Sequence, residues 1–270
     1  MCGGRRYGRR MTEHEAFAVE LAHAAAAETL PLFRGDCEAD NKLSNGGFDP
    51  VTAADRNAEA AIRRLIAERY PHHGVIGEEY GEDRPDAEHV WVLDPVDGTR
   101  AFIAGLPLWT TLIALRTQGR PRIGLIAQPY LDEVFIGGPS GAWLIRGETH
   151  TPLKTRACER LTEAVISTTD PDIFNGAELG AWTQVRAAAR LARFGCDAYA
   201  YAMVAAGHID MVVEAGLKVW DWSALIPVVE AAGGRITDWR GGDALAGQVM
   251  AAGDARLIDQ ALVTLKRAAL

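Results

Sequence analysis

The residues with the clearest chemical potential are two carboxylates, Asp94 and Asp97, which follow a short apolar run at 90–93. A run of this length is typical of a buried strand. Pro95 would interrupt the strand because proline cannot donate to a sheet ladder, and Gly98 permits a sharp turn directly afterwards. Carboxylates are ligands that Mg²⁺ prefers, and backbone N–H groups at a turn that opens a helix suit a phosphate. The stretch thus offers metal ligands beside an anion site, although D-P-x-D-G is also a common turn sequence.

Two further acidic residues stand at the ends of predicted elements. Glu78 follows a short predicted strand at 74–77, and Asp221 lies at the start of a predicted helix. If the fold brings both residues to Asp94 and Asp97, the four carboxylates form an oxygen-only cluster for two or three Mg²⁺ ions. Two metals can clamp the attacking and leaving oxygens of an in-line phosphoryl displacement, and they lower the pKa of a bound water.

Other hydrolytic chemistries lack their sequence patterns. The chain shows no Ser-His-Asp or Cys-His nucleophile pattern, no GxxxxGK[ST] loop and no HExxH. These absences disfavour covalent hydrolases, P-loop NTPases and zincins.

The composition indicates a globular protein with an acidic balance. The 270 residues are 48% hydrophobic and 24% charged, with a formal net charge of −8. A general nucleic-acid binder would carry a basic patch, so we expect no nucleic-acid partner. The four cysteines show no CxxC spacing, and no apolar run approaches the ~20 residues of a membrane span. We therefore expect a cytoplasmic protein without a membrane partner. The metal and phosphate chemistry of the acidic motifs indicates a small phosphate ester as its substrate.

Alternating helices and strands must position these side chains. Residues 1–10, MCGGRRYGRR, are basic and glycine-rich, so we expect a disordered leader over 1–11, with Met11 as a plausible true start. Thr12 and Thr52 are predicted helix N-caps, and Asp55 favours the helix start that follows Thr52. The predicted helices cover 12–30, 52–70, 178–192, 197–207, 220–232 and a segment from about 254. The predicted strands cover 74–77, 90–93, 109–115, antiparallel hairpins over 122–145, then 164–169, 209–213 and 235–237.

Three ordered segments resemble the signatures of the inositol monophosphatase family, whose members are Mg²⁺-dependent, lithium-sensitive phosphatases. The segments are GEE at 77–79, DPVDGTRAF at 94–102, and WDWSA at 220–224 with AGG at 232–234. The segment DPVTAAD at 49–55 also resembles the N-terminal motif of that family. The resemblance implies a fold of the α/β (α+β) class, a layered αβαβα sandwich, commonly as a homodimer. It implies a single domain over 12–270, with an α+β part to about 150 and an α/β part from about 151.

The same resemblance assigns roles residue by residue. Thr99, together with Glu78, would orient the attacking water, and the Gly98 and Thr99 amides would hold the phosphate. Asp55 would be a third catalytic residue, lying around the metal site near the loop that carries Lys42. The metal ligands would be Glu78, Asp94, the Val96 carbonyl, Asp97 and Asp221.

Other segments depart from the inositol-hydrolysing pattern and resemble the histidinol-phosphatase branch of the family. These are STTDP at 167–171, FGCDAYAY at 194–201 and EAGLK at 214–218. Substrate contacts would then come from Thr168, Asp197 and Glu214. L-Histidinol phosphate carries an ammonium group that a carboxylate can pair with, whereas inositol offers only hydroxyls. We therefore expect a histidinol-phosphatase of histidine biosynthesis.

Two alternatives stay open. One is an inositol-directed or broad-specificity monophosphatase, and the other is a catalytically silent, metal-binding regulatory protein. A bisphosphate nucleotidase is disfavoured because no added base-binding segment is present.

Overall fold

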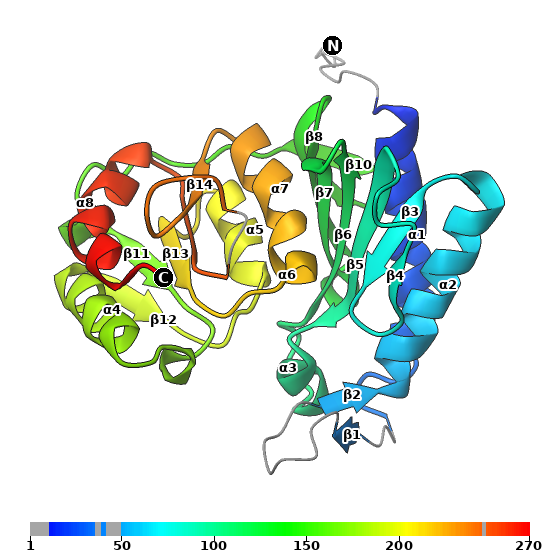
Figure 1. Ribbon diagram of the computed structural model, residues 1–270, viewed down its shortest axis with the longest axis horizontal. Coiled ribbons are helices and arrows are strands. Elements are labelled where there is room, and N and C mark those ends of the chain that lie inside the picture. The colour runs from blue at the N-terminus through cyan, green and yellow to red at the C-terminus, as the bar shows by residue number, and fades with distance from the viewer. Residues whose placement is uncertain (1–10, 36–38, 42–49, 245–246) are drawn as a thin grey trace, which may run out of the picture.

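The computed structural model describes residues 11–35, 39–41, 50–244 and 247–270. Residues 1–10 of the predicted leader and Lys42 lie outside these ranges. The described chain forms five alternating layers, with a helix pair, an eight-stranded sheet, a middle helix layer, a five-stranded sheet and an outer helix layer (Figure 1). The predicted αβαβα architecture is confirmed.

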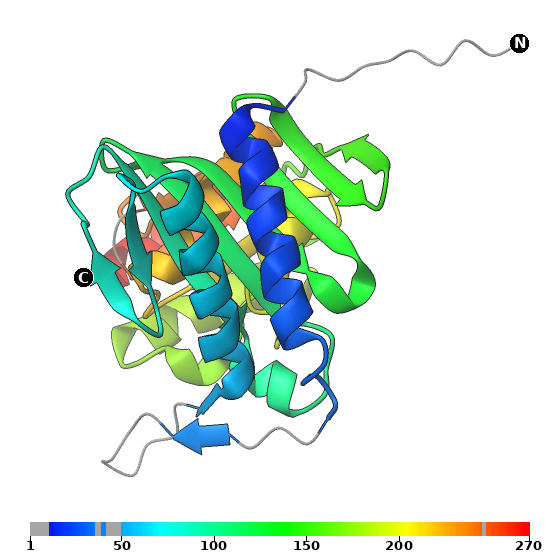
Figure 2. The ribbon, with the colours of Figure 1, turned by 90° about the vertical axis from the view of Figure 1, so that its right-hand side faces the viewer.

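The first layer consists of α1 (Glu13–Thr29) and α2 (Ala53–Arg69), which lie side by side on one face of the eight-stranded sheet (Figure 2). Both helices begin with the predicted cap. Thr12 and Thr52 each form a capping box, and the reciprocal partner of Thr52 is Asp55. Two backbone donors at each helix start are thereby satisfied, which explains why the local pattern predicted these starts.

The eight-stranded sheet brings the first two acidic motifs together. β3 (Gly74–Gly77) pairs in parallel with β5 (His89–Asp97), and the last aligned pair is Gly77 with Leu93. Glu78 and Asp94, the next residue on each strand, therefore leave the same edge of the sheet next to each other. In spatial order the strands are β10 (Thr149–Pro152), β9 (Gly141–Arg146), β8 (Glu133–Gly138), β7 (Arg120–Gln128), β6 (Thr110–Thr117), β5 (His89–Asp97), β3 (Gly74–Gly77) and β4 (Gly81–Asp83).

The middle layer corrects one prediction. The helix expected over 220–232 is two helices, α6 (Val219–Ser223) and α7 (Leu225–Ala231), which meet at Ala224. Pro227 has no N–H to bond to the carbonyl of Ser223, so a continuous helix would lose that bond. The third helix of this layer is α5 (Tyr199–Ala205).

The five-stranded sheet and its helices correct two more predictions. The helix expected over 178–192 ends earlier, as α4 (Ala177–Ala188), and β12 (Leu191–Arg193) pairs in parallel with β11 (Val165–Ser167). A central strand, β15 (Val249–Ala252), lay in a stretch that the sequence pattern left unassigned. The remaining elements here are β13 (Met211–Glu214), β14 (Arg235–Asp238) and α8 (Ala255–Leu265). The short elements elsewhere are β1 (Ala39–Asn41), β2 (Pro50–Thr52) and α3 (Thr99–Ile103). Across the described ranges, no helix is long and apolar enough to cross a membrane.

Two glycines allow α7 to lie directly on the eight-stranded sheet. A Cβ atom on Gly124 of β7 would lie 2.0 Å from the carbonyl oxygen of Ala224. One on Gly137 of β8 would lie 2.2 Å from that of Pro227. These distances are far below van der Waals contact, so any side chain at either glycine would push α6 and α7 away from the sheet.

We expect Gly124→Ala to lower the free energy of unfolding by ~1–3 kcal/mol, the usual cost of overpacking. The matched control is Gly180→Ala in α4, where an added Cβ meets nothing within 4 Å. That variant should gain about 0.5–1 kcal/mol because alanine favours a helix. Urea denaturation of both proteins measures the difference. Equal stabilities would contradict the close packing of α7.

Candidate active site

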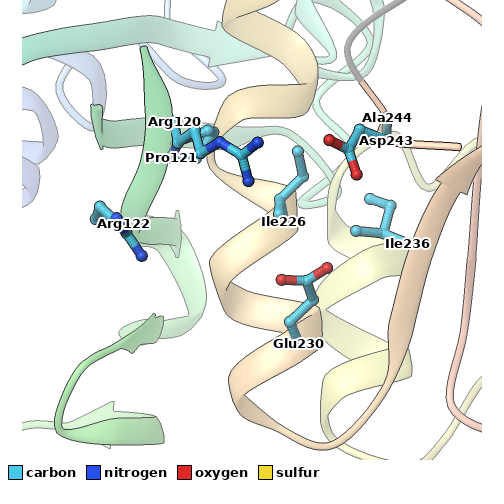
Figure 3. Close-up of a pocket in the computed structure, with 8 residues that line it drawn as sticks. All are labelled: Arg120, Pro121, Arg122, Ile226, Glu230, Ile236, Asp243 and Ala244. Atoms are coloured by element: carbon cyan, nitrogen blue, oxygen red, sulfur yellow. The ribbon is translucent and has the colours of Figure 1, made fainter. Parts of the chain in front are cut away.

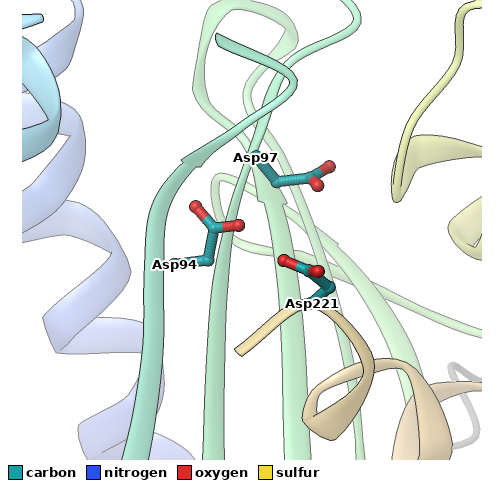
Figure 4. Close-up of side chains that lie close together, drawn as sticks. All are labelled: Asp94, Asp97 and Asp221. Atoms are coloured by element: carbon teal, nitrogen blue, oxygen red, sulfur yellow. The ribbon is translucent and has the colours of Figure 1, made fainter. Parts of the chain in front are cut away.

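Three carboxylates converge where β5 ends. Asp94, Asp97 and Asp221 each offer an oxygen, and these oxygens all lie within 4.8 Å of one another. Figure 4 shows Asp94 and Asp97 projecting from the end of β5 and Asp221 from the start of α6 toward a common space. The pairing of β5 with β6 is irregular between Asp94 and Asp97, which allows both side chains to face this space.

Hydrogen bonds hold these carboxylates in place. Asp97 Oδ2 accepts from the backbone N–H of Ala198 at 2.8 Å and from the Thr110 hydroxyl at 3.2 Å. Asp94 Oδ1 accepts from the N–H of Val96 at 3.1 Å. These donors fix the orientation of each carboxylate, but they leave several lone pairs for another ligand.

The electrostatics of the cluster fit a cation. Burial, followed by the charges of Glu78 and Asp97, raises the pKa of Asp94 well above its ordinary value. Burial and then the charge of Asp197 raise the pKa of Asp97 in the same way. The pKa of Asp221 rises to about 7, chiefly through burial. A hard divalent cation with oxygen ligands would offset this repulsion, so the residues present suit a metal site.

Asp221 reaches the cluster because α6 starts beside β5. Its Oδ2 accepts from the backbone N–H of Lys218 at 2.6 Å, as the N3 residue of a capping box. The same carboxylate thus caps its own helix and faces Asp94 and Asp97.

Glu78 and Asp55 lie around the three aspartates. The negative charge of Glu78 contributes to the raised pKa values of Asp94, Asp55 and Asp221, so it lies close to all three. Asp55 is buried, and its Oδ2 accepts from the N–H and the hydroxyl of Thr52 at 2.8 and 2.6 Å. Its observed contacts are those of a helix cap, and its catalytic role stays a prediction.

Sequence reasoning missed the residue that holds the turn after β3, the turn that contains Glu78. Glu59 of α2 is fully buried, and its carboxylate accepts from the backbone N–H groups of Glu79 and Tyr80 at 2.8 and 3.1 Å. Gly77 leaves room for it, since a Cβ there would lie 2.0 Å from Glu59 Oε1. A glutamate within a helix gives no local signal for such a role.

The predicted phosphate site follows β5 directly. Gly98 directly precedes α3 and has φ +80°. This is a left-handed backbone conformation, which glycine adopts readily. The Thr99 hydroxyl donates to the Val96 carbonyl at 3.1 Å, so these two predicted site groups are in contact. A carbonyl oxygen has a second lone pair, which leaves Val96 able to reach a metal.

Two of the three predicted substrate residues, Asp197 and Glu214, line a neighbouring cavity of about 180 Å³, together with Asp97 and Asp221. Asp197 is predicted to start a helix, but it has φ +43° and precedes α5, which begins at Tyr199. Its carboxylate lies over Gly98. Burial raises its pKa to about 6. Glu214, at the end of β13, accepts from the N–H of Thr169 at 2.6 Å, and burial raises its pKa to about 8.

Two threonines and a tyrosine complete the description of this cavity. Thr169 is among its lining residues, whereas the predicted Thr168 is fully buried and is not among the described residues that line it. Tyr201 of α5 also lines the cavity, although sequence reasoning did not single it out. Its hydroxyl is buried and has no hydrogen-bond partner within the described part of the chain. A buried hydroxyl without a partner is costly, so it is suited to donate to a bound ligand.

Comparison with known proteins is consistent with this geometry. Residues 10–268 match the inositol monophosphatase family. The bifunctional phosphatase IMPL2 of Arabidopsis thaliana is 40% identical, covering 94% of this chain and 76% of its own length. A histidinol-phosphatase of Chlorobaculum parvum is 35% identical, covering 86% and 88%. The solved structure of an inositol monophosphatase from Zymomonas mobilis is 38% identical, with a TM-score of 0.85. The match covers 95% of this chain and 100% of that chain.

The fold, the oxygen-only acidic cluster and these matches define a metal-dependent phosphomonoesterase. The chain belongs to the inositol monophosphatase family. The similar proteins include histidinol-phosphatases, inositol monophosphatases and Nus factor SuhB by name, so family membership alone leaves the substrate open.

We expect Asp94→Asn to abolish turnover and the stabilisation that Mg²⁺ gives the wild type. A ligand at 100 times its Kd contributes about 2.7 kcal/mol to stability, which Asn at this position should largely remove. The metal-free variant should be more stable than the metal-free wild type, because one of the repelling charges is gone.

Thermal melts with EDTA or Mg²⁺, beside a phosphate-release assay, measure these effects. Asp86→Asn is the control, because Asp86 is exposed and lies outside the cluster. Full activity together with an unchanged Mg²⁺ response in Asp94→Asn would contradict the metal assignment.

Proposed function

We propose that this protein hydrolyses L-histidinol phosphate to L-histidinol and phosphate, with Mg²⁺ as its metal, as a step in histidine biosynthesis. The observation that carries the proposal is the pair of carboxylates, Asp197 and Glu214, in the cavity that adjoins the metal cluster. An ammonium group at this position would form charge-assisted hydrogen bonds with them. The resemblance to histidinol-phosphatases supports the same substrate.

The roles of the chain's own residues follow from their positions. Asp94, Asp97 and Asp221, with the Glu78 carboxylate and the Val96 carbonyl nearby, would hold two or three Mg²⁺ ions. When bound, Mg²⁺ activates water and stabilises negative charge on the phosphoryl group.

The phosphate and the water would be held by the turn after β5. The Gly98 and Thr99 amides would donate to phosphate oxygens, and the Thr99 hydroxyl with Glu78 would orient the attacking water in line with the leaving oxygen. The leaving alcohol would then point toward Asp197, whose carboxylate lies over Gly98.

Burial explains how Glu214 and Asp197 would discriminate between substrates. Burial is the main cause of their raised pKa values, and at Asp197 the positive charge of Arg100 offsets it only in part, so the cavity would still be stabilised by a further positive charge. The ammonium of histidinol phosphate would supply that charge, whereas inositol would not. The cavity therefore favours a cationic alcohol over a neutral one.

Inositol 1-phosphate is the second candidate substrate, favoured by the likeness to the Zymomonas mobilis enzyme. A catalytically silent regulatory protein is the third candidate. It need not keep every catalytic residue, yet Glu78, Asp94, Asp97, Thr99 and Asp221 are all present. We further propose a homodimer, as the family resemblance implies, and a cytoplasmic location, as the cysteine pattern indicates.

We expect kcat/KM with Mg²⁺ to be at least tenfold higher for L-histidinol phosphate than for inositol 1-phosphate, about the value of one charge-assisted hydrogen bond. Asp197→Asn should reduce this preference, because it removes the charge and asparagine tolerates the left-handed backbone. Phosphate release at matched substrate concentrations measures both. Equal rates for the two esters would overturn the substrate assignment, and an unchanged preference in Asp197→Asn would remove that residue from recognition.

We expect Tyr201→Phe to raise KM for L-histidinol phosphate by about 2- to 10-fold, the range for losing one neutral hydrogen bond. Its thermal stability should not fall, since the hydroxyl has no hydrogen-bond partner in the part of the chain that the structure describes. Tyr199→Phe is the matched control: its hydroxyl donates to Glu133 at 2.6 Å, so it should lose stability at constant KM. A loss of thermal stability at constant KM in Tyr201→Phe would show that the Tyr201 hydroxyl does not contact the substrate.

A further inference from the structure

A second cavity, of about 190 Å³, lies where β7, α7 and β14 come together. It is separate from the acidic cluster, yet α7 borders both cavities, through Leu225 at the first and Ile226 and Glu230 at the second. Figure 3 shows Arg120 reaching from the β7 side toward Ile226 and Asp243, with Arg122 farther out on the same side and Ile236 and Asp243 on the second sheet and the loop after it.

Four charged side chains surround this cavity, two of each sign. They are Arg120, Arg122, Glu230 and Asp243. All four are exposed, while Ile236 is buried and Ile226 is half-buried. The cavity therefore has a charged rim over an apolar floor, which is the usual layout of a small-molecule site.

The charges of the rim are not neutralised within the protein. Within the described ranges none of the four forms an ion pair or a side-chain hydrogen bond. Burial and the negative charge of Asp243 raise the pKa of Glu230, so the two carboxylates lie close enough to repel each other. The acidic side thus lacks a cation, and the guanidinium groups on the β7 side lack an anion.

The geometry points to a binding site for a free α-amino acid with an apolar side chain. We propose that its ammonium group pairs with Glu230 and Asp243, and that its carboxylate pairs with Arg120 and Arg122. A guanidinium presents paired donors that match a carboxylate, and the floor of Ile226 and Ile236 would accept the side chain. The cavity is smaller than the ~300–1,000 Å³ of a site for a drug-sized ligand, which suits a molecule of this size.

A metal ion does not fit this rim. Only two carboxylates face the cavity, and the acidic cluster at Asp94 is the one group of three or more potential ligands found in the described part of the chain. The arginines on the opposite side would also repel a cation. A ligand with both charges satisfies both sides at once.

Isothermal titration of the full-length protein with L-leucine tests the proposal. Two one-charge analogues dissect it: 3-methylbutylamine lacks the carboxylate and 4-methylpentanoate lacks the ammonium. The variants are Arg120→Gln and Glu230→Gln, and Glu148→Gln in the turn after β9 is the charge-matched control. The three substitutions are at exposed positions, and circular dichroism verifies that each variant folds.

We expect saturable binding with one L-leucine per chain. Each one-charge analogue, and each of the two rim variants, should bind about tenfold more weakly or worse, because a charge-assisted contact is lost. Glu148→Gln should bind like the wild type. Absence of saturable heat with L-leucine at millimolar concentration would overturn the proposal. So would equal affinities in the rim variants and the control.

Discussion

The parallel pairing of β3 with β5 is the constraint on which the site depends. It aligns Gly77 with Leu93, so that Glu78 and Asp94 leave neighbouring strands at the same edge. The irregular end of β5 then turns Asp97 to the same side, and α6 places Asp221 opposite. Backbone pairing is strong and directional, so it can hold together carboxylates that would otherwise move apart.

Holding these charges together costs free energy in the metal-free protein. Burial and mutual repulsion raise the pKa values of Asp94, Asp97 and Asp221, which means that each would be more stable with a proton or a metal. The same burial and repulsion make the cluster suited to bind a cation. Stability and function are thus linked through one group of side chains, as in many metal-dependent hydrolases.

Helix α7 couples this site to the rest of the molecule. Gly124 and Gly137 let its backbone lie directly on the eight-stranded sheet, and the preceding α6 carries Asp221. One end of α7 borders the cavity that Asp197 and Glu214 line, and further residues along it border the cavity with the charged rim. Both cavities therefore form where the two sheets meet across the middle helix layer.

The sequence by itself determined the helix starts at Thr12 and Thr52, the strand and turn around Asp94, and the layered fold implied by three ordered motifs. These are local patterns, because a capping box spans four residues, such as Thr12 to Glu15, and a strand is set by its own apolar run. Other features depended on contacts between distant segments. The N–H of Ala198 holds Asp97 across 101 residues, and Glu59 of α2 shapes the turn after β3. Only the tertiary structure could show that Thr169 rather than Thr168 lines the cavity, and that Tyr201 lines it with a buried hydroxyl that has no hydrogen-bond partner among the described residues. The orientation and burial of a side chain are decided by what packs around it, and local sequence does not contain that information.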